Sequence, residues 1–257
     1  MYLQKNQLNG RTAFVTGAAR GIGYCTAEAL AEAGASVVVS DISNDPIEYA
    51  ARALRAKGYD VKAQVLDVTN SQDCTAAAER FNSNGAAIDI LIANAGISWK
   101  DTRAEEVDDA SWARVLDVNL NGTFYCCRAF GRYMLERGRG SIVTVGSMSG
   151  FISNKPQNQV HYNASKAAVH HLTKSLAGEW ADRGVRVNSV APTYVNTPMS
   201  NVTAKVPEYN DIWMEGTPMK RMIEPEEVAS VNLFLASDAS SGMTGSVVLV
   251  DAGYTIW

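Results

Sequence analysis

The sequence of 257 residues contains no apolar run that approaches the roughly 18 residues needed to span a membrane. Residues 1–7 lack the apolar segment of a signal peptide. The net charge of −4 supplies no basic surface for nucleic acid. We therefore expect a cytoplasmic protein that binds neither membranes nor nucleic acids.

Cysteine and histidine are also scarce, with four and three residues. The cysteines have neither the spacing of a metal site nor that of a redox pair, so we expect reduced thiols in the core. The histidines show no H-E-x-x-H or similar pattern. A catalytic metal is therefore not expected.

Short apolar runs alternate with helical stretches along the whole chain. Strand-like runs lie at residues 11–16, 35–40, 60–66, 88–93, 141–145, 185–190 and 246–250. This alternation predicts an α/β fold, a doubly wound Rossmann-type parallel sheet of seven strands with helices on both faces. Since no linker divides the sequence, residues 1–257 are expected to form a single domain, with a substrate-covering lid at roughly 193–224.

A glycine-rich turn follows the first expected strand. Gly17, Gly21 and Gly23 lie between this strand and an alanine-rich helical stretch that runs to Ala33. Such glycines let the backbone approach a pyrophosphate, whose charge is met by free N–H groups at the helix N-terminus. The pattern predicts a dinucleotide site, and a glycine turn without a ligand is the alternative.

The second expected strand leads to Asp41, about 20 residues after the glycines. A carboxylate there can accept both ribose hydroxyls of the adenosine and repels a 2′-phosphate, so NAD(H) is favoured. Arg20 in the glycine turn could pair with that phosphate, which keeps NADP(H) open.

Tyr162 and Lys166 are four residues apart in an expected helix and therefore share one face. A nearby ammonium group favours the phenolate and lowers a pKa that is ordinarily near 10. Such a pair suits proton exchange with an alcohol or carbonyl oxygen. Because the chain has ten tyrosines, a chance match is not rare, and the pair needs support from other motifs.

Taken in order, the motifs resemble those of the short-chain dehydrogenase/reductase family. Thr16 with the three glycines is similar to T-G-x-x-x-G-x-G, and Ala93-Asn94-Ala95-Gly96 is similar to N-N-A-G. The active-site Asn of the family matches Asn119, and a strand-end Ser precedes Tyr162 and Lys166. The resemblance implies an oxidoreductase that transfers a hydride between nicotinamide C4 and a carbon that bears oxygen.

The resemblance implies roles for four catalytic residues. Tyr162 would move the proton, and Ser147 would hydrogen-bond the reacting oxygen. Lys166 would lower the phenol pKa and hold the nicotinamide ribose, while Asn119 would anchor a water that links Lys166 to solvent. A local interruption of the helix is the alternative reading of Asn119. The residues implied for cofactor binding are Gly17, Arg20, Gly21, Ile22, Gly23, Asp41, Asp67, Val68, Asn94, Ala95, Gly96, Tyr162, Lys166, Pro192, Val195 and Thr197.

Two positions depart from the family pattern. Either Ser147 or Ser149 could be the catalytic serine, and we choose Ser147 because the rigid strand fixes its position, whereas a loop absorbs two residues. The usual Pro-Gly after the sixth strand is Pro192-Thr193 here, so a side chain stands where glycine is common. The nicotinamide contacts of Thr193 and Val195 are therefore left open.

Uncharged polar residues lie between the catalytic serine and Tyr162, and each could bind a hydroxyl. This segment and residues 251–257 resemble the bacterial polyol dehydrogenases, which act on sugar alcohols such as galactitol, sorbitol and arabinitol. Interconversion of a polyol and a ketose is therefore the leading activity, and an ordinary solvated loop is the alternative. The residues predicted to contact the substrate are Ser147, Ser149, Asn154, Gln159 and Tyr162.

Three other functions stay open. A 3-oxoacyl carrier-protein reductase has the same catalytic set but would prefer NADPH, which Asp41 disfavours. A broad-range ketone reductase differs mainly in its lid, whose shape a sequence shows poorly. A nicotinamide-sensing regulator that lacks turnover is disfavoured by the intact Ser147, Tyr162 and Lys166.

The resemblance also implies an assembly and a metal site. The family commonly forms homotetramers through two long helices, here roughly 108–136 and 160–183, and the C-terminal strand region. Members of the polyol group can hold a structural divalent cation, for which the Trp257 carboxylate would be an oxygen ligand. Apolar positions that could serve either the assembly or the sheet are Phe124, Ala129, Phe130, Ala168, Leu172 and Leu176.

Overall fold

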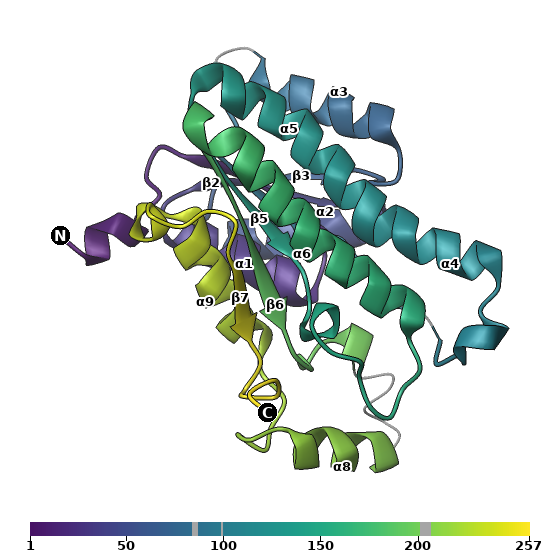
Figure 1. Ribbon diagram of the computed structural model, residues 1–257. Helices are drawn as coiled ribbons and strands as arrows, with labels where there is room; N and C mark the ends of the chain where they lie inside the picture. Colours follow the sequence, from purple (N-terminus) through teal and green to yellow (C-terminus); the bar gives the residue numbers. More distant parts are fainter. Residues whose placement is uncertain (84–86, 99, 201–206) are drawn as a thin grey trace.

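The computed structural model describes residues 1–83, 87–98, 100–200 and 207–257. Within these ranges, seven parallel strands form one sheet in the order β3-β2-β1-β4-β5-β6-β7, with helices on both faces (Figure 1). This arrangement confirms the predicted doubly wound α/β fold. The strands are β1 (Thr12–Thr16), β2 (Ser36–Asp41), β3 (Val61–Val65), β4 (Ile90–Ala93), β5 (Gly140–Val145), β6 (Val185–Pro192) and β7 (Val247–Val250).

Helices that connect the strands cover both faces of the sheet, with α1, α2 and α9 on one face and α3, α5 and α6 on the other. The helix expected at 108–136 consists of α4, a π-helical turn (Asp117–Gly122) and α5, and the helix expected at 160–183 is α6 followed by a short 3-10 turn. No helix among the described residues is both long and apolar enough to cross a membrane. The α-helices are α1 (Gly21–Glu32), α2 (Asn44–Ala56), α3 (Ser71–Asn82), α4 (Asp109–Leu116), α5 (Thr123–Arg137), α6 (Val160–Trp180), α8 (Pro207–Gly216) and α9 (Pro225–Ala236).

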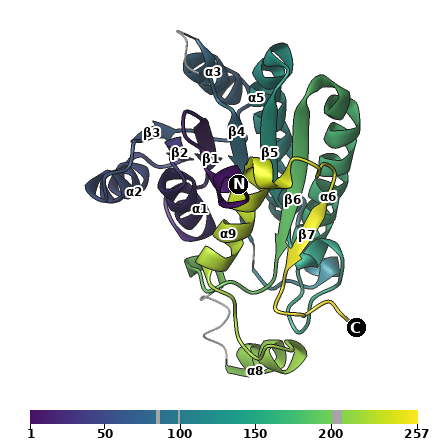
Figure 2. The ribbon, with the colours of Figure 1, turned by 90° about the vertical axis from the view of Figure 1, so that its left-hand side faces the viewer.

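The alternation of side chains along the strands builds two apolar layers. In β1, Ala13 and Val15 join a cluster with residues of α1, α2 and α9, whereas Phe14 joins a cluster with residues of α3, α5 and α6. Figure 2 shows the sheet between these two groups of helices. Burying a side chain such as Phe14 stabilises the fold by roughly 1.5–3 kcal/mol.

Helices α5 and α6 run side by side across one face of the sheet (Figure 1). Their close approach depends on Gly131, because a Cβ there would lie 2.8 Å from the Trp180 ring. Phe130 and Leu176 are buried in the cluster against the sheet, whereas Leu172 is only partly buried. Phe130 and Leu176 therefore serve the core of the chain itself.

The carboxyl ends of the parallel strands lie at one edge of the sheet, where doubly wound folds bind their ligands. Helix α8 lies beyond this edge, near the C-terminus (Figures 1 and 2). It belongs to the lid predicted at 193–224, of which residues 201–206 lie outside the described residues. The predicted lid and the predicted nucleotide turn thus lie at the same edge.

Candidate active site

The glycine turn after β1 packs directly against the turn after β4. Gly17 and Gly21 have φ angles of +62° and +59°, which L-residues with a Cβ rarely adopt. A Cβ on Gly17 would lie 2.8 Å from the Ala95 Cα, and one on Gly23 would lie 2.4 Å from the Gly17 carbonyl oxygen. The turn accommodates only glycine at these positions and leaves its backbone open to a close ligand.

Asn94 fixes the conformation of this turn. Its Nδ2 donates to the carbonyl oxygens of Thr16 at 2.9 Å and Gly17 at 3.0 Å. In return, Thr16 Oγ1 accepts the backbone N–H groups of Asn94 and Ala95, both at 3.0 Å. The motif around Asn94 therefore locks the nucleotide turn, because its amide is committed to the backbone.

Asp41 ends β2 at the rim of the glycine turn. Its Oδ2 accepts the N–H of Ala19 at 3.3 Å, and its Oδ1 accepts the N–H of Ile42 at 2.8 Å. Arg20 lies exposed at the N-terminus of α1, on the same rim. Both predicted determinants of the cofactor phosphate preference are thus near the turn, as the sequence indicated.

The remaining predicted cofactor residues surround the same edge. Asp67 accepts the N–H and the hydroxyl of Thr69, at 2.9 and 2.7 Å. Val68 packs on Gly122, where a Cβ would lie 2.7 Å from Val68 Cγ2. Thr197 lies against the glycine turn, 3.3 Å from the position of a Cβ on Gly21. A cradle of glycines closed by the segment after β6 fits a dinucleotide.

Tyr162 and Lys166 occupy one face of α6, as their spacing predicts. The Lys166 Nζ lies 5.6 Å from the centre of the Tyr162 ring and donates to the Val145 carbonyl at 2.8 Å. Burial lowers the pKa of Lys166 to about 8. The pair is therefore placed for proton transfer, with Tyr162 lining the pocket and Lys166 buried behind it.

The phenol itself differs from the sequence-based expectation of a lowered pKa. Burial raises the pKa of Tyr162 above its usual value, and the neighbouring Ser147 hydroxyl opposes this rise. The Lys166 amine is directed to the Val145 carbonyl. A helical spacing carries no information about burial, which here raises the pKa of Tyr162, and the effect of Lys166 on the phenol remains a prediction.

Ser147 follows β5 directly and precedes a short 3-10 turn. Its Oγ accepts the N–H of Ser149 at 3.1 Å and donates to Ser149 Oγ at 3.1 Å. It also lies 3.5 Å from the Pro192 carbonyl oxygen, with the geometry of a weak hydrogen bond. The hydroxyl is fixed on two sides, and it lines the pocket that contains Tyr162.

Asn119 is completely buried in the π-helical turn between α4 and α5. Its Oδ1 accepts the Ile97 N–H at 2.8 Å, and its Nδ2 donates to the Ile97 carbonyl at 3.0 Å and to Ser165 Oγ at 3.1 Å. π-turns inside α-helices often occur at functional sites. Here the side chain ties the segment after β4 to α6, and its predicted role in holding a water remains a prediction.

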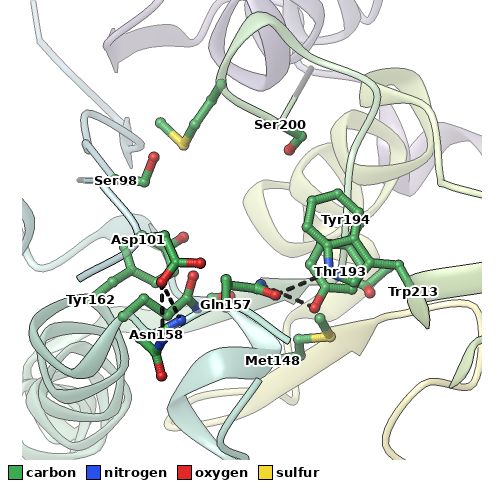
Figure 3. Close-up of a pocket in the computed structure, with 13 residues that line it drawn as sticks. Ser98, Asp101, Met148, Gln157, Asn158, Tyr162, Thr193, Tyr194, Ser200 and Trp213 are labelled. Carbon is green, nitrogen blue, oxygen red and sulfur yellow. Dashed lines mark hydrogen bonds between the residues drawn. The ribbon is translucent and has the colours of Figure 1, made fainter. Parts of the chain in front are cut away.

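The substrate pocket opens beside Tyr162 (Figure 3). Of the residues predicted to contact the substrate, Ser147, Gln159 and Tyr162 line it. Ser149 and Asn154 are buried behind the wall, where both contact the Gln159 amide, at 3.3 and 2.9 Å. The other residues that line the pocket are Ser98, Asp101, Met148, Gln157, Asn158, Thr193, Tyr194, Met199, Ser200 and Trp213.

An aromatic pair forms one wall of the pocket. The Tyr194 ring stacks on Trp213 of α8, with ring centres 3.9 Å apart and planes 11° from parallel. Gln157 holds both, because its Nε2 donates to the Tyr194 hydroxyl at 3.2 Å and its Oε1 accepts from Trp213 Nε1 at 3.0 Å. Helix α8 is thereby attached to the loop before α6.

Several pocket residues were not predicted from the sequence. Asp101 lies beyond the motif that ends at Gly96, and Tyr194 follows the unusual Pro192-Thr193 pair. Trp213 lies in the predicted lid, and its presence there among prolines and methionines was the available signal. Thr193 lines the pocket, and its buried Oγ1 has no hydrogen-bond partner among the described residues.

The fold and this constellation define an α/β oxidoreductase of the Rossmann type, with a nucleotide turn beside a Tyr–Lys–Ser centre. A family model described as "Enoyl-(Acyl carrier protein) reductase" matches residues 17–255. The chain belongs to the short-chain dehydrogenase/reductase family.

Two relatives are similar over nearly their whole length. Galactitol 2-dehydrogenase of Rhizobium johnstonii is 54% identical, over 100% of this chain and 99% of that protein. Galactitol 2-dehydrogenase (L-tagatose-forming) of Cereibacter sphaeroides is 46% identical, over 98% of this chain and 97% of that protein. The similarity to these two polyol dehydrogenases is thus one of sequence over the whole chain, and not of fold alone.

Solved structures show the same architecture. The crystal structure of gox2181 superposes with a TM-score of 0.98 at 49% identity, over 100% of both chains. A gluconate 5-dehydrogenase from Burkholderia cenocepacia in complex with NADP and tartrate superposes with a TM-score of 0.94 at 33% identity, over 100% of both chains. Family members therefore bind a nicotinamide dinucleotide on this fold.

Proposed function

We propose that the protein oxidises a secondary alcohol of a sugar alcohol to a ketose, and catalyses the reverse reaction, with NAD(H). The observation that carries this proposal is the pocket beside Tyr162, whose wall combines serine, asparagine and glutamine side chains with a stacked aromatic pair. Amides and hydroxyls match a chain of substrate hydroxyls. The two galactitol 2-dehydrogenase relatives favour the same substrate class over a 3-oxoacyl chain or a broad range of ketones.

Ser147, Tyr162 and Lys166 have separate roles in the proposed reaction. A bound nicotinamide accepts or supplies the hydride. In the oxidation, Ser147 Oγ donates a hydrogen bond to the reacting oxygen and holds it beside Tyr162. Tyr162, as phenolate, removes the hydroxyl proton, and in the reduction its phenol returns that proton. Lys166 stabilises the phenolate by its charge.

Asp41 supports a preference for NAD(H) over NADP(H). Its carboxylate already accepts two backbone N–H groups, from Ala19 and Ile42, and therefore stays at the rim of the glycine turn. A 2′-phosphate would meet this negative charge at close range. Arg20 is exposed on the same rim and weakens the preference without reversing it.

The finer assignments are proposals as well. We expect a homotetramer that uses α5, α6 and the region of β7, and a cytoplasmic location. A divalent cation at the Trp257 carboxylate is proposed from the resemblance alone. Across the residues that the structure describes, no group of three or more His, Cys, Asp or Glu side chains is arranged to hold a metal ion.

A cofactor-monitored screen tests the proposed activity. Sugar alcohols are offered with NAD or NADP, and ketoses with NADH or NADPH, to the wild type and to the Tyr162→Phe variant. We expect turnover of at least one polyol–ketose pair, with higher kcat/KM for NAD(H), which disappears in the variant. Turnover of simple ketones or acyl thioesters without turnover of any polyol would contradict the proposal.

A further inference from the structure

Asp101 lies at the mouth of the substrate pocket, in the segment between β4 and α4 (Figure 3). Its Oδ1 accepts the backbone N–H and the side-chain Nδ2 of Asn158, both at 3.0 Å. Its Oδ2 accepts the hydroxyl of Tyr209, from α8, at 2.5 Å. The carboxylate is therefore held in place by the loop before α6 and by the lid.

This carboxylate keeps its charge at neutral pH. Partial burial acts to raise the pKa of Asp101, but the hydrogen bonds from Tyr209 and Asn158 outweigh burial and lower it. A carboxylate offers about four acceptor positions, of which these bonds occupy three. One acceptor position is left for a group that enters the pocket.

The described residues that line the pocket include one carboxylate, Asp101, and neither lysine nor arginine. The nearest cationic group of the reaction centre is Lys166, which is buried and donates to the Val145 carbonyl. Lys100 lines a separate cavity, with Thr102 and His161. The described wall therefore presents a negative charge that no cation on that wall offsets.

We propose that Asp101 determines specificity by charge, admitting neutral polyols and disfavouring sugar acids. This inference rests on the proposed polyol activity and names its substrate class more closely. A neutral polyol can donate a hydroxyl to the open acceptor position of Asp101, whereas the carboxylate of an aldonate is repelled. The distinction between polyols and sugar acids matters because a solved gluconate 5-dehydrogenase has the same fold, with a TM-score of 0.94.

The repulsion is moderate because Asp101 is exposed at the pocket mouth. Charges near a surface interact through a high effective dielectric constant and are screened by salt. We therefore expect Asp101 to lower kcat/KM for an anionic substrate, relative to a neutral one, by roughly five- to tenfold at low ionic strength. This factor should approach one at roughly 0.5 M salt. A purely structural role of Asp101 would not produce this salt dependence.

The experiment compares Asp101→Asn with the wild type on two matched pairs of alcohols. The first pair is D-sorbitol and D-gluconate, and the second is 4-(hydroxymethyl)cyclohexanol and 4-hydroxycyclohexanecarboxylate. In each pair the ratio of kcat/KM for the neutral alcohol to that for the anion should fall roughly five- to tenfold in the variant, mainly through a lower KM for the anion. The amide oxygen can still accept from the two donors of Asn158, and the amide NH₂ can donate to the Tyr209 hydroxyl, so the change is chiefly one of charge.

Two control variants separate charge at the pocket from other effects. Asp108→Asn makes the same change in net charge at the N-terminus of α4, outside this pocket, and should leave both ratios unchanged. Tyr209→Phe removes the lid contact and keeps the carboxylate, so it too should leave the ratios unchanged. An unchanged ratio in Asp101→Asn, or an equal change in Asp108→Asn, overturns the inference.

The second pair keeps this test independent of the polyol proposal. If D-sorbitol and other polyols are not oxidised, the proposed function fails, and the cyclohexane pair still reports the effect of charge. If the wild type oxidises neither pair, calorimetric binding of each compound to the enzyme–NADH complex gives the corresponding affinity ratio. An affinity ratio that Asp101→Asn leaves unchanged also overturns the inference.

Discussion

His170 lies directly beneath Ser147, and its Nε2 accepts the Ser147 backbone N–H at 3.4 Å. The ring fits because Gly146 and Gly150 have no side chains: a Cβ would lie 2.3 Å from Nε2 at Gly146 and 2.5 Å from Cε1 at Gly150. Burial, together with the charges of nearby lysines, lowers the pKa of His170 to about 4. The ring is therefore neutral and can accept the backbone N–H of Ser147, the serine proposed to be catalytic.

This relationship predicts a pH-dependent stability. Between the unfolded-state pKa of about 6.5 and the folded-state value of about 4, the unfolded chain binds more protons at His170. The contribution of neutral His170 to stability is complete above pH 6.5 and is lost as the pH falls towards 4.

The His170→Gln variant tests this. Its free energy of unfolding should decrease less than that of the wild type between pH 7 and pH 4, by about 2 kcal/mol after allowance for solvent screening. Urea unfolding at the two pH values measures this, with His171→Gln, an exposed neighbour, as the unchanged control.

Tyr162→Phe should reduce kcat by at least a hundredfold while the affinity for NADH stays nearly constant. Only the phenolic proton is lost, and general acid–base catalysis contributes on the order of 10² to 10⁴. Steady-state kinetics and cofactor titration measure the two effects. A variant that keeps more than about a tenth of the wild-type kcat would exclude the proton-transfer role.

Lys166→Met should stabilise the cofactor-free protein and impair its function. Because burial lowers the pKa of Lys166 to about 8, the folded state holds an ammonium at neutral pH at a cost in free energy. We expect the free energy of unfolding to rise by roughly 1–3 kcal/mol below pH 8, and the gain to vanish near pH 10.5, where the unfolded lysine also loses its proton. The control is Lys174→Met on the exposed side of α6.

The same variant should bind NADH more weakly and lose turnover, since Lys166 is proposed to hold the ribose and to stabilise the phenolate. Fluorescence titration with NADH measures the affinity. Equal stability of wild type and Lys166→Met at pH 7, combined with unchanged cofactor affinity, would contradict both assignments.

Asp41→Ala should narrow the difference in kcat/KM between NADH and NADPH, chiefly through a lower KM for NADPH, because the carboxylate at the glycine turn is removed. Arg20→Ala is the opposing variant and should widen the difference. Initial rates with the two cofactors, at a fixed concentration of ketose, measure both. If the wild type has the same kcat/KM for NADPH as for NADH, Arg20 offsets Asp41, and the proposed preference for NAD(H) is wrong.

Ser147→Ala should lower kcat for a simple cyclic ketone and for a sugar alcohol alike, by roughly 10²-fold, because the hydrogen bond to the reacting oxygen is common to both. Ser149→Ala should have a smaller effect, since Ser149 is buried behind the pocket wall and its backbone N–H still supports Ser147. Parallel kinetics on both substrates compare the variants. Complete loss of activity in Ser149→Ala alone would require the two assignments to be exchanged.

Asn154 illustrates a difference between sequence and structure. Its place between the catalytic serine and Tyr162 suggested a direct contact with substrate hydroxyls, yet its side chain bonds to the Tyr194 hydroxyl and to Gln159, at 3.3 and 2.9 Å. Its amide supports the pocket wall from behind. Residues in a loop can point to either side, and only the packing of distant elements selects the side.

The sequence by itself determined the sheet, the nucleotide turn and the Tyr162–Lys166 pair. These features depend on short-range physics: the alternation of buried strands, the backbone freedom of Gly17 and Gly21, and the repeat of one helix. Such constraints act within a few residues and can be read locally.

Only the tertiary structure decided the specificity of the pocket and the state of its groups. Asp101 meets Tyr209 across 108 positions of the sequence, and Gln157 meets Trp213 across 56. Burial, which raises the pKa of Tyr162, also arises from segments that are distant along the chain. The paths of loops and the desolvation of charges depend on the whole packed molecule, because each is a sum over neighbours that no local pattern encodes.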